Sequence, residues 1–321
     1  MFTYIARRLL YSIPVVFVAS FLLFWAVRTV FDPLAKLRGG PDPGAIARVT
    51  ERLGLDRSIP EQYWRWLASF ATGDWGVSSR TTGPVLRLIL PALGTTLQLI
   101  VWGVLLAAVI ALAVGVYSAV RQYSAGDLAF TGLSYLGIAM PPFWLGLILI
   151  QFLAAWPQEL LGLTDPPLYF VGLHSPDGGG PLDYLRHLVL PVLTLTIGLV
   201  ASWSRFTRAT MLEALTSEYV RTARAKGVPR RRIVVRHALR TALGPFVSVT
   251  AVDAGLLFGG LVVTEQIFAI QGMGRLFLDS LLAGDVFVLV PWTLVIAVVV
   301  IVFNLLADLA YAVLDPRVRL R

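Results

Sequence analysis

The sequence contains no cysteine, so the chain can form neither a disulfide nor a thiolate metal site. Lysine is nearly absent as well: Lys36 and Lys226 are the two lysines among 27 basic residues, which we interpret as a coding bias toward arginine. Charge of either sign is scarce, since 14% of the 321 residues are charged and soluble domains average about 25%. Hydrophobic residues, in contrast, make up 57% of the chain. Most of the chain is therefore predicted to face lipid.

Several catalytic patterns are missing too. The sequence has no G-x-x-x-x-G-K-[ST] segment to cradle nucleotide phosphates, and no H-E-x-x-H or G-x-S-x-G segment. His174, His187 and His237 are isolated from one another. We therefore expect no catalytic residue, no metal site and no cofactor bound by this chain. A net charge of +8 is compatible with nucleic acid, but in a membrane chain its distribution matters more than its sum, and we expect no nucleic-acid partner.

Six apolar segments are long enough to cross a bilayer, which takes about 20 helical residues. The first, from Leu9 to Val27, follows Arg7 and Arg8 and is longer than the apolar region of a signal peptide. We expect it to be retained, and a twin-arginine export signal is the alternative. The other five are predicted near residues 92–117, 128–156, 187–202, 245–263 and 286–309. The predicted fold class is an all-α integral membrane protein with six transmembrane helices.

The segment after the first span differs from the rest because it is polar and rich in tryptophan. A short helix is expected between Asp42 and Gly54, and a second one starting at Ser58 and Pro60. These helices either lie at the headgroup level or form a small cap with its own core. The predicted domains are an N-terminal transmembrane helix over 1–30, an extracytoplasmic helical insertion over 31–90, and a five-helix core over 91–321 with a cytoplasmic loop over 203–244.

Polar features inside the spans are candidates for a transport path. Pro141 and Pro142 lie in the third predicted span, where they would bend the helix. Asp253 lies in the middle of the fifth span, Glu265 at its outer end, and Asp308 near the inner end of the sixth. Intramembrane carboxylates are costly in lipid and usually face a bundle interior, so they could line a path or relay protons. The alternatives are a helix-pairing hydrogen bond for Asp253 and interface positions for the other two.

The distribution of basic residues predicts the orientation. With the N-terminus in the cytoplasm, the four inner segments hold about 16 lysines and arginines, whereas Arg275 is the one basic residue of the short outer loops. Six spans return the C-terminus, with its arginine tail, to the same side. Both termini are therefore predicted to be cytoplasmic.

The segment Glu213–Pro245 is the long polar interruption of the second half of the chain. We expect two short helices in it, the first over 218–226 and capped by Ser217. Gly227 follows where a helix C-terminus favours positive φ, and Pro229 suits the first turn of the second helix. The segment is either a surface that a partner grips or a basic loop held at anionic lipid.

The motif Thr222-Ala223-Arg224-Ala225-Lys226-Gly227, followed by His237-Ala238-Leu239-Arg240, resembles the B-type permease subunits of dipeptide/oligopeptide ABC importers. The wider family of binding-protein-dependent permeases carries E-A-A, three residues, then G, with a proline further on. Here Arg221-Thr222-Ala223 replaces E-A-A, Gly227 is kept, and Arg240 stands at the proline position, as is typical of the peptide branch. Other matches follow in order, among them Leu53-Gly54-Leu55-Asp56, Thr95-Thr96-Leu97, Pro141-Pro142-Phe143-Trp144 and Gly260 to Gly274.

This resemblance implies a type I ABC importer permease fold and half of an ATP-driven translocation pathway for short peptides. It identifies the basic segment as the coupling helix, with ATPase contacts expected at Glu218, Tyr219, Arg221, Thr222, Ala223, Arg224, Ala225, Lys226 and Gly227. Pathway or gate residues are expected at Pro141, Pro142, Asp253, Glu265 and Phe268. Docking of a binding protein is expected at Gly272, Gly274, Arg275 and Asp285. Gln271 replaces a usual proline, Gly284 replaces a usual arginine, and the charge of Asp253 is unusual for this branch.

The partners implied are a second homologous permease subunit, two ATPase domains or subunits that hold ATP and Mg, an extracytoplasmic substrate-binding protein and the bilayer. The implied location is the bacterial cytoplasmic (inner) membrane. Nickel, glutathione or a sugar are alternative cargoes within the family. Outside it, the alternatives are an ion-coupled secondary transporter that uses intramembrane carboxylates, an intramembrane hydrolase, and a membrane anchor or receptor without translocation.

Overall fold

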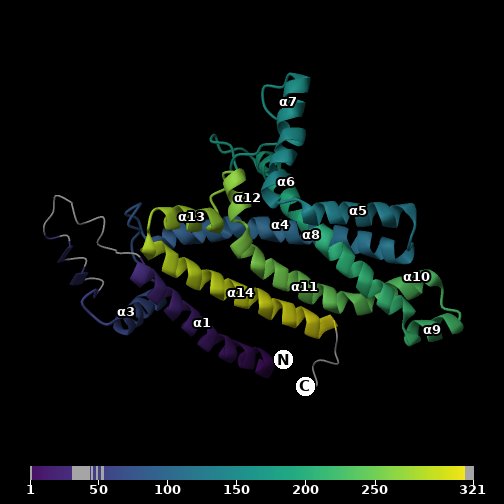
Figure 1. The fold of residues 1–321 in the computed structure, drawn as a ribbon, viewed down its shortest axis with the longest axis horizontal. Coiled ribbons are helices and arrows are strands. Elements are labelled where there is room, and N and C mark those ends of the chain that lie inside the picture. The colour runs from purple at the N-terminus through teal and green to yellow at the C-terminus, as the bar shows by residue number, and fades with distance from the viewer. Residues whose placement is uncertain (1, 31–43, 45, 48–49, 52–53, 315–321) are drawn as a thin grey trace. The chain divides into compact units, whose positions relative to one another are not determined.

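The structure is a computed structural model that describes residues 2–30, 44, 46–47, 50–51 and 54–314. In these ranges the chain is built from helices, without any strand longer than the isolated bridge between Val77 and Pro84. The helices labelled in Figure 1 are α1 (Phe2–Val30), α3 (Ile59–Ala71), α4 (Val85–Val120), α5 (Ala125–Ala139), α6 (Pro142–Ile150), α7 (Trp156–Leu161), α8 (Pro181–Thr216), α9 (Glu218–Ala225), α10 (Arg230–Arg232), α11 (Leu239–Gly260), α12 (Val262–Ile267), α13 (Met273–Leu282) and α14 (Val286–Leu314). Two π-helical segments, η2 (Gln151–Ala155) and η3 (Ile233–Ala238), join neighbouring helices.

The prediction of six spans is confirmed. Six helices of the described residues are long and apolar enough to cross a membrane, over Leu10–Val30, Val85–Val120, Pro142–Leu161, Pro181–Thr216, Arg230–Gly259 and Val286–Ala310. The helices α4 and α8 have 36 residues each, which exceeds the about 20 residues that the hydrocarbon requires. The predicted helix that starts at Asp42 and the C-terminal arginine tail lie outside the described residues.

The third span differs from its prediction. We expected one bent helix over 128–156, but α5 ends at Ala139 and α6 begins at Pro142. Met140 and Pro141 between them are extended, with ψ angles of 124° and 138°. The cause is local, because a residue that precedes proline is pushed out of the helical region, and here two such residues follow each other. The apolar stretch that can span a membrane starts after this break and continues through η2 into α7.

The second helix of the basic segment also differs from its prediction. It is not a short separate helix, because α10 continues through η3 into α11 and reaches Gly260. Between Arg230 and Leu243 no glycine or proline interrupts the helical sequence. The basic residues therefore form the first turns of the helix that carries the fifth span.

The contacts divide the chain into two compact units, of which the first comprises residues 1–94 and 272–301. Its core packs Phe24 and Val27 of α1 around Tyr63 of α3, together with Val286 and Val290 of α14. Figure 1 shows α1 and the beginning of α14 in this unit, with α3 near the end of α1. The prediction of a helix starting at Ser58 and Pro60 is confirmed by α3.

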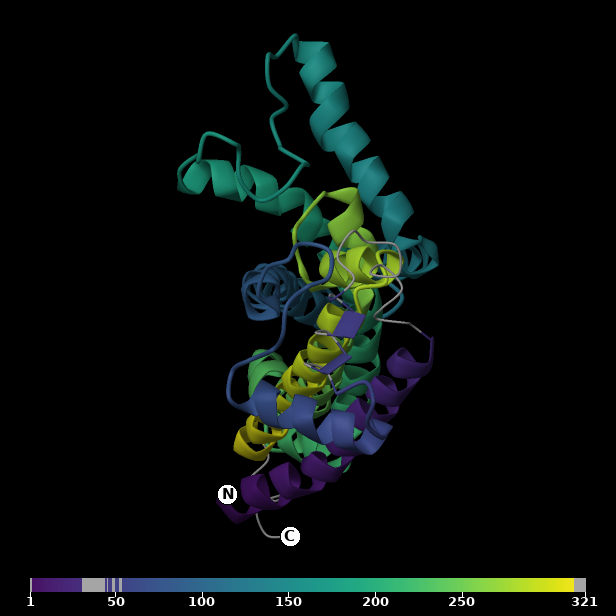
Figure 2. The same ribbon diagram turned by 90° about the vertical axis from the view of Figure 1, so that its left-hand side faces the viewer.

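The second unit comprises residues 95–271 and 302–321. Its centre is α8, which packs on α5 and α11, with Trp203 fully buried against Phe246. A partly buried ion pair joins α5 to α8, since Arg208 donates two hydrogen bonds of 2.8 and 2.9 Å to the buried Asp127 carboxylate. Figure 2 shows the rod formed by α6, η2 and α7, and the loop that returns from its tip to the start of α8.

Candidate functional site

The helix α9 ends in the way that its sequence predicts. Gly227 has a φ of +72°, the left-handed conformation that glycine adopts without a steric penalty. Its amide donates to the Arg224 carbonyl (2.9 Å), and the next amide, of Val228, donates to the Ala223 carbonyl (3.1 Å). These two bonds form a Schellman motif, which satisfies the last carbonyls of the helix. The chain therefore leaves α9 in a defined direction.

The start of α9 was predicted differently. Ser217 occupies the position before the first helical residue, but its side chain accepts no hydrogen bond from α9. Its hydroxyl donates to the Ala214 carbonyl at 2.5 Å. The reason is that α8 ends only one residue earlier, so the hydroxyl satisfies the end of α8 and not the beginning of α9.

The inner face of α9 packs on a small apolar cluster. Val220, Ala223 and Ile233 are buried there, with Leu215 and Val228 partly buried against them. Burying the two branched aliphatic side chains contributes on the order of 1.5–3 kcal/mol each. This cluster links α9 to the end of α8 and to η3, so the three segments are held together by a few side chains.

The outer face of α9 is charged and exposed. Glu218 and Arg221 form an ion pair of 2.6 Å whose side chains are 83% and 68% exposed. Such an exposed pair contributes at most about 0.5 kcal/mol to stability. The Tyr219 hydroxyl donates to Oγ1 of Thr241 at 3.1 Å. Of the nine residues expected to contact an ATPase, Ala223 lies on the buried face, and the other eight are exposed.

The expected pathway residues have different environments. Asp253 on α11 is half-buried and accepts a hydrogen bond of 2.7 Å from Nε1 of Trp203 on α8. Glu265 on α12 is fully buried and accepts a hydrogen bond of 2.6 Å from the Thr96 hydroxyl on α4. Phe268 is also fully buried. Pro141 and Pro142 are exposed at the break between α5 and α6.

The residues expected to dock a binding protein are largely internal to the first unit. Gly272 and Gly274 are buried, and Arg275 is half-buried. Asp285 is 1% exposed, and its carboxylate accepts three hydrogen bonds from the preceding loop. The donors are the Ser78 hydroxyl (2.5 Å) and the backbone amides of Ser79 and Arg80 (3.2 Å each). This carboxylate therefore holds the loop before α4.

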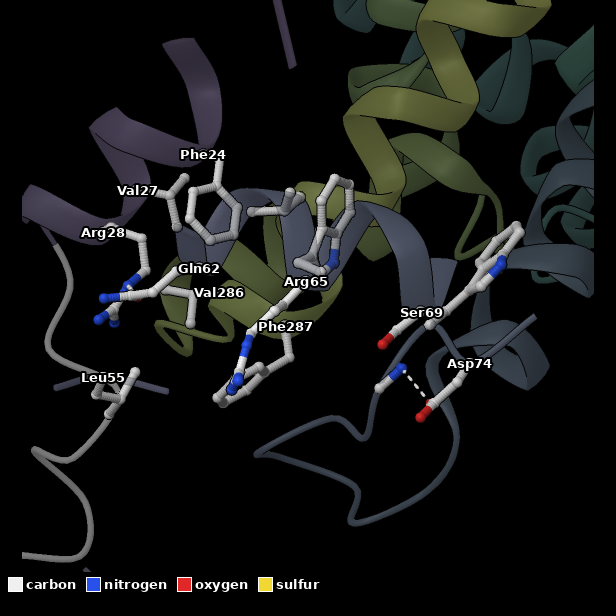
Figure 3. A pocket seen from close by; sticks show the side chains of 14 residues that line it. Phe24, Val27, Arg28, Leu55, Gln62, Arg65, Ser69, Asp74, Val286 and Phe287 are labelled. Carbon is white, nitrogen blue, oxygen red and sulfur yellow. Dashed lines mark hydrogen bonds between the residues drawn. The ribbon is translucent and has the colours of Figure 1, made fainter. Parts of the chain in front are cut away.

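The first unit also contains a cavity of about 220 Å³ that the sequence did not indicate. Figure 3 shows Arg28 and Gln62 at one end of it and Ser69 and Asp74 at the other. Arg28 donates through Nε to Oε1 of Gln62 at 2.9 Å. A signal that could have indicated this cavity is the density of aromatic residues, four of which line it: Phe24, Trp66, Trp75 and Phe287.

Comparison with known proteins identifies the family of this chain. Residues 111–320 match the family described as binding-protein-dependent transport system inner membrane component, and residues 1–100 match the model for the N-terminal part of such membrane components. The chain belongs to this family. It is thus a multi-pass inner-membrane transport component, as the resemblance of its motifs implied.

Curated relatives match this permease along its full length. It is 37% identical over 325 residues to the oligopeptide transport system permease protein AppB of Bacillus subtilis (strain 168), with 99% of both chains covered. It is 34% identical over 336 residues to the dipeptide transport system permease protein DppB of Escherichia coli (strain K12), again with 99% of both chains covered. The di/tripeptide transport system permease protein DppB of Pseudomonas aeruginosa (strain UCBPP-PA14) is 36% identical over 333 residues, with the same coverage.

A solved structure confirms the predicted fold. The permease superposes on a chain of the MetNI methionine ABC transporter in an inward-facing conformation, with a TM-score of 0.55 and 18% identity. The match covers 72% of this chain and 97% of the other. The prediction of a type I ABC importer permease fold is therefore confirmed.

Proposed function

We propose that this permease forms half of the translocation pathway of an ATP-driven importer of short peptides. The substrate class is supported by the relatives, which are named oligopeptide, dipeptide and di/tripeptide permeases and match the chain from end to end. The coupling role is supported by α9, a short helix with a buried apolar face and an exposed charged face. This exposed face is the observation on which the proposal depends.

The proposed assembly contains this permease, a second homologous permease, two ATPase domains that bind ATP and Mg, and an extracytoplasmic binding protein. The basic segment faces the cytoplasm, because arginine and lysine accumulate on that side of membrane proteins. Both termini are then cytoplasmic in this proposal, and this chain carries out no bond chemistry of its own.

The packing around α9 supports a mechanical role. The apolar cluster of Val220, Ala223 and Ile233 connects α9 both to α8 and to the helix that starts at Arg230 and includes α11. A push on α9 by an ATPase would act on both long helices together. Two packed states of such a bundle need differ by only a few kcal/mol, so a rigid-body rotation is sufficient to switch the pathway.

Asp253 is the residue that we assign to the pathway in this proposal. Its hydrogen bond to Trp203 fixes one carboxylate oxygen, and the half-buried side chain carries a charge suited to the amino terminus of a peptide. Asp253→Asn keeps the size and removes the charge, so uptake of unblocked peptides should fall more than uptake of N-acetylated peptides. Unchanged uptake and an unchanged substrate range would remove this residue from the pathway.

The test of coupling compares two glycines of the second unit. Gly227 follows α9 and has a φ of +72°, and Gly162 follows α7 and has a φ of +61°; no atom lies within 4 Å of a Cβ added at either position. A valine in this conformation costs about 1–2 kcal/mol at both sites. We expect Gly227→Val to abolish peptide uptake into vesicles and peptide-stimulated ATP hydrolysis while membrane insertion stays normal. Gly162→Val should keep most of the uptake.

Normal uptake by Gly227→Val, or an equal loss in both variants, would contradict the coupling role of α9. The same vesicles also discriminate against the ion-coupled alternative. A protonophore should leave uptake intact as long as ATP is supplied, and loss of uptake under these conditions would favour an ion-coupled transporter.

A further inference from the structure

Two adjoining cavities lie at the end of α4 in the second unit, beside the basic segment. The larger one has a volume of about 1000 Å³ and the smaller one about 510 Å³. Both are lined by Val120 and Arg121 at the end of α4 and by Arg230 and Val234 after Pro229. Since they share these residues, we treat them as one surface and call it the α4 groove.

Arginines surround the α4 groove, and most of them lack an acidic partner. The arginines that line its two cavities are Arg121, Arg221, Arg224, Arg230 and Arg231. Within the described part of the chain, Arg221 alone of these five forms an ion pair, with Glu218. Arg230 donates to the Val120 carbonyl at 2.8 Å, and Arg121 lies over the Tyr117 ring at 5.5 Å. Four positive charges of the groove therefore have no carboxylate partner among the described residues.

The smaller cavity has apolar walls. Ala113, Val116 and Val120 lie on one side of α4, at the spacing that places residues on the same face of a helix. They extend over about 10 Å along the helix axis. Val234 and Val235 of η3 line the same cavity, and Val235 is 56% exposed. The groove thus combines an apolar channel with a cationic end.

We infer that the α4 groove binds an anionic phospholipid, with its phosphate at Arg121 and Arg231 and an acyl chain along Ala113, Val116 and Val120. Guanidinium groups pair with phosphate oxygens through two parallel hydrogen bonds. The acyl chain would cover apolar surface that is exposed in the chain alone. Basic pockets between transmembrane helices at the membrane surface suit such headgroups. A free phosphate would use only the arginines, and an acidic protein segment would leave the apolar channel empty.

Such a lipid would border the coupling helix, because Arg221 and Arg224 of α9 also line the larger cavity. Arg230 and Val234 belong to the helix that α9 moves in the proposed mechanism, whereas Val120 belongs to α4. The lipid would therefore connect the moving helix to α4. The inference uses the proposed orientation only to assign the lipid to the cytoplasmic leaflet, and lipid binding itself does not depend on transport.

The experiment measures the lipid that the full chain, purified in detergent, retains. Phosphatidylglycerol and phosphatidylcholine with identical acyl chains are added in equal amounts, and bound lipid is counted by native mass spectrometry. The test variant is Arg121→Gln/Arg231→Gln, because neither side chain donates a hydrogen bond within the described residues; the Arg121 guanidinium lies over the Tyr117 ring. The control variant is Arg232→Gln/Arg236→Gln, which removes two positive charges from the same segment at positions that line neither cavity. Size-exclusion profiles and melting temperatures verify that both variants are folded.

We expect the wild type and the control variant to retain phosphatidylglycerol in preference to phosphatidylcholine, and the test variant to bind it roughly tenfold more weakly. Equal retention of the two lipids by the wild type would overturn the inference, and so would an equal loss in both variants. Displacement by inorganic phosphate at matched concentration would show an anion site without a lipid and would also overturn it. Loss of the lipid when the ATPase subunits bind would show that the groove is a contact surface for the ATPase, and this result would also overturn the inference. None of these outcomes bears on peptide uptake, so the inference and the proposed function fail separately.

Discussion

Two segments of this permease lie next to long helices, but they are held in opposite ways. The α9 segment is fixed by an apolar inner face, and its charged residues point outward. The loop before α4 is fixed by the Asp285 carboxylate, which is buried and accepts three hydrogen bonds from the loop. The same kind of residue, a charged side chain next to a span, is thus a surface group in one unit and an internal anchor in the other.

This difference separates residues that a partner can reach from residues that only shape the surface. An exposed ion pair contributes little to folding, so Glu218 and Arg221 are free to change partners at little cost. A buried carboxylate that holds a loop cannot leave its donors without a large loss of stability. If a binding protein docks near Asp285, the contact is made by the loop that this carboxylate positions.

The largest effect is expected from breaking the anchor of the loop. Asp285→Ala leaves the Ser78 hydroxyl and two backbone amides without their acceptor and should destabilise the first unit by on the order of 3 kcal/mol. The matched control is Asp279→Ala, which removes a partly exposed ion pair of 3.5 Å with Arg80. That pair should be worth at most about 1 kcal/mol. Thermal unfolding in detergent and limited proteolysis between residues 76 and 84 measure both.

If Asp279→Ala lowers the melting temperature as much as Asp285→Ala, burial is not what distinguishes the two carboxylates. The contrast with the α9 segment would then lose its physical basis.

An intermediate effect is expected at the buried carboxylate of the second unit. Hydrogen bonds from Arg208 lower the pKa of Asp127 from 3.8 to about 2. Because the pKa is lower in the folded state, the ion pair stabilises the fold above about pH 4, by about 2 kcal/mol, and this contribution is lost as the pH falls toward 2. Melting temperatures between pH 7 and pH 3 should therefore fall more steeply for the wild type than for Asp127→Asn. Parallel curves would show that this pair does not contribute to acid sensitivity.

The smallest effect on stability is expected on the exposed face of α9. Glu218→Gln removes the ion pair with Arg221 and should change the free energy of unfolding by less than about 0.5 kcal/mol. If this face contacts an ATPase, peptide-stimulated ATP hydrolysis should nevertheless fall several-fold in the assembled transporter. A variant that loses stability and keeps its coupling would reverse the assignment of the two segments.

The features that sequence reasoning predicted correctly are those that depend on neighbours in the chain. The left-handed conformation of Gly227 follows from where a helix must end, and the six spans follow from the length of apolar runs. The break at Met140 is also encoded locally, because each of two successive prolines restricts the residue before it to extended conformations.

The features that were missed depend on partners far away in the chain. The bond from Ser78 to Asp285 joins residues 207 positions apart, and the bond from Thr96 to Glu265 joins residues 169 positions apart. No local pattern distinguishes such buried carboxylates from exposed ones. The hydroxyl of Ser217 shows the same limit over a short distance, because its partner depends on where α8 ends.

The π-helical turn at Ile233–Ala238 sets the angular register of the basic residues. A segment of this kind accommodates one residue more than an α-helix does over the same length. If the same six residues adopted ordinary α-helical geometry, everything on their N-terminal side would be rotated by about 100° around the helix axis. Arg230 would then turn away from the Val120 carbonyl, while Asp253 would keep its place opposite Trp203. The direction in which the arginines point is thus set by one surplus residue.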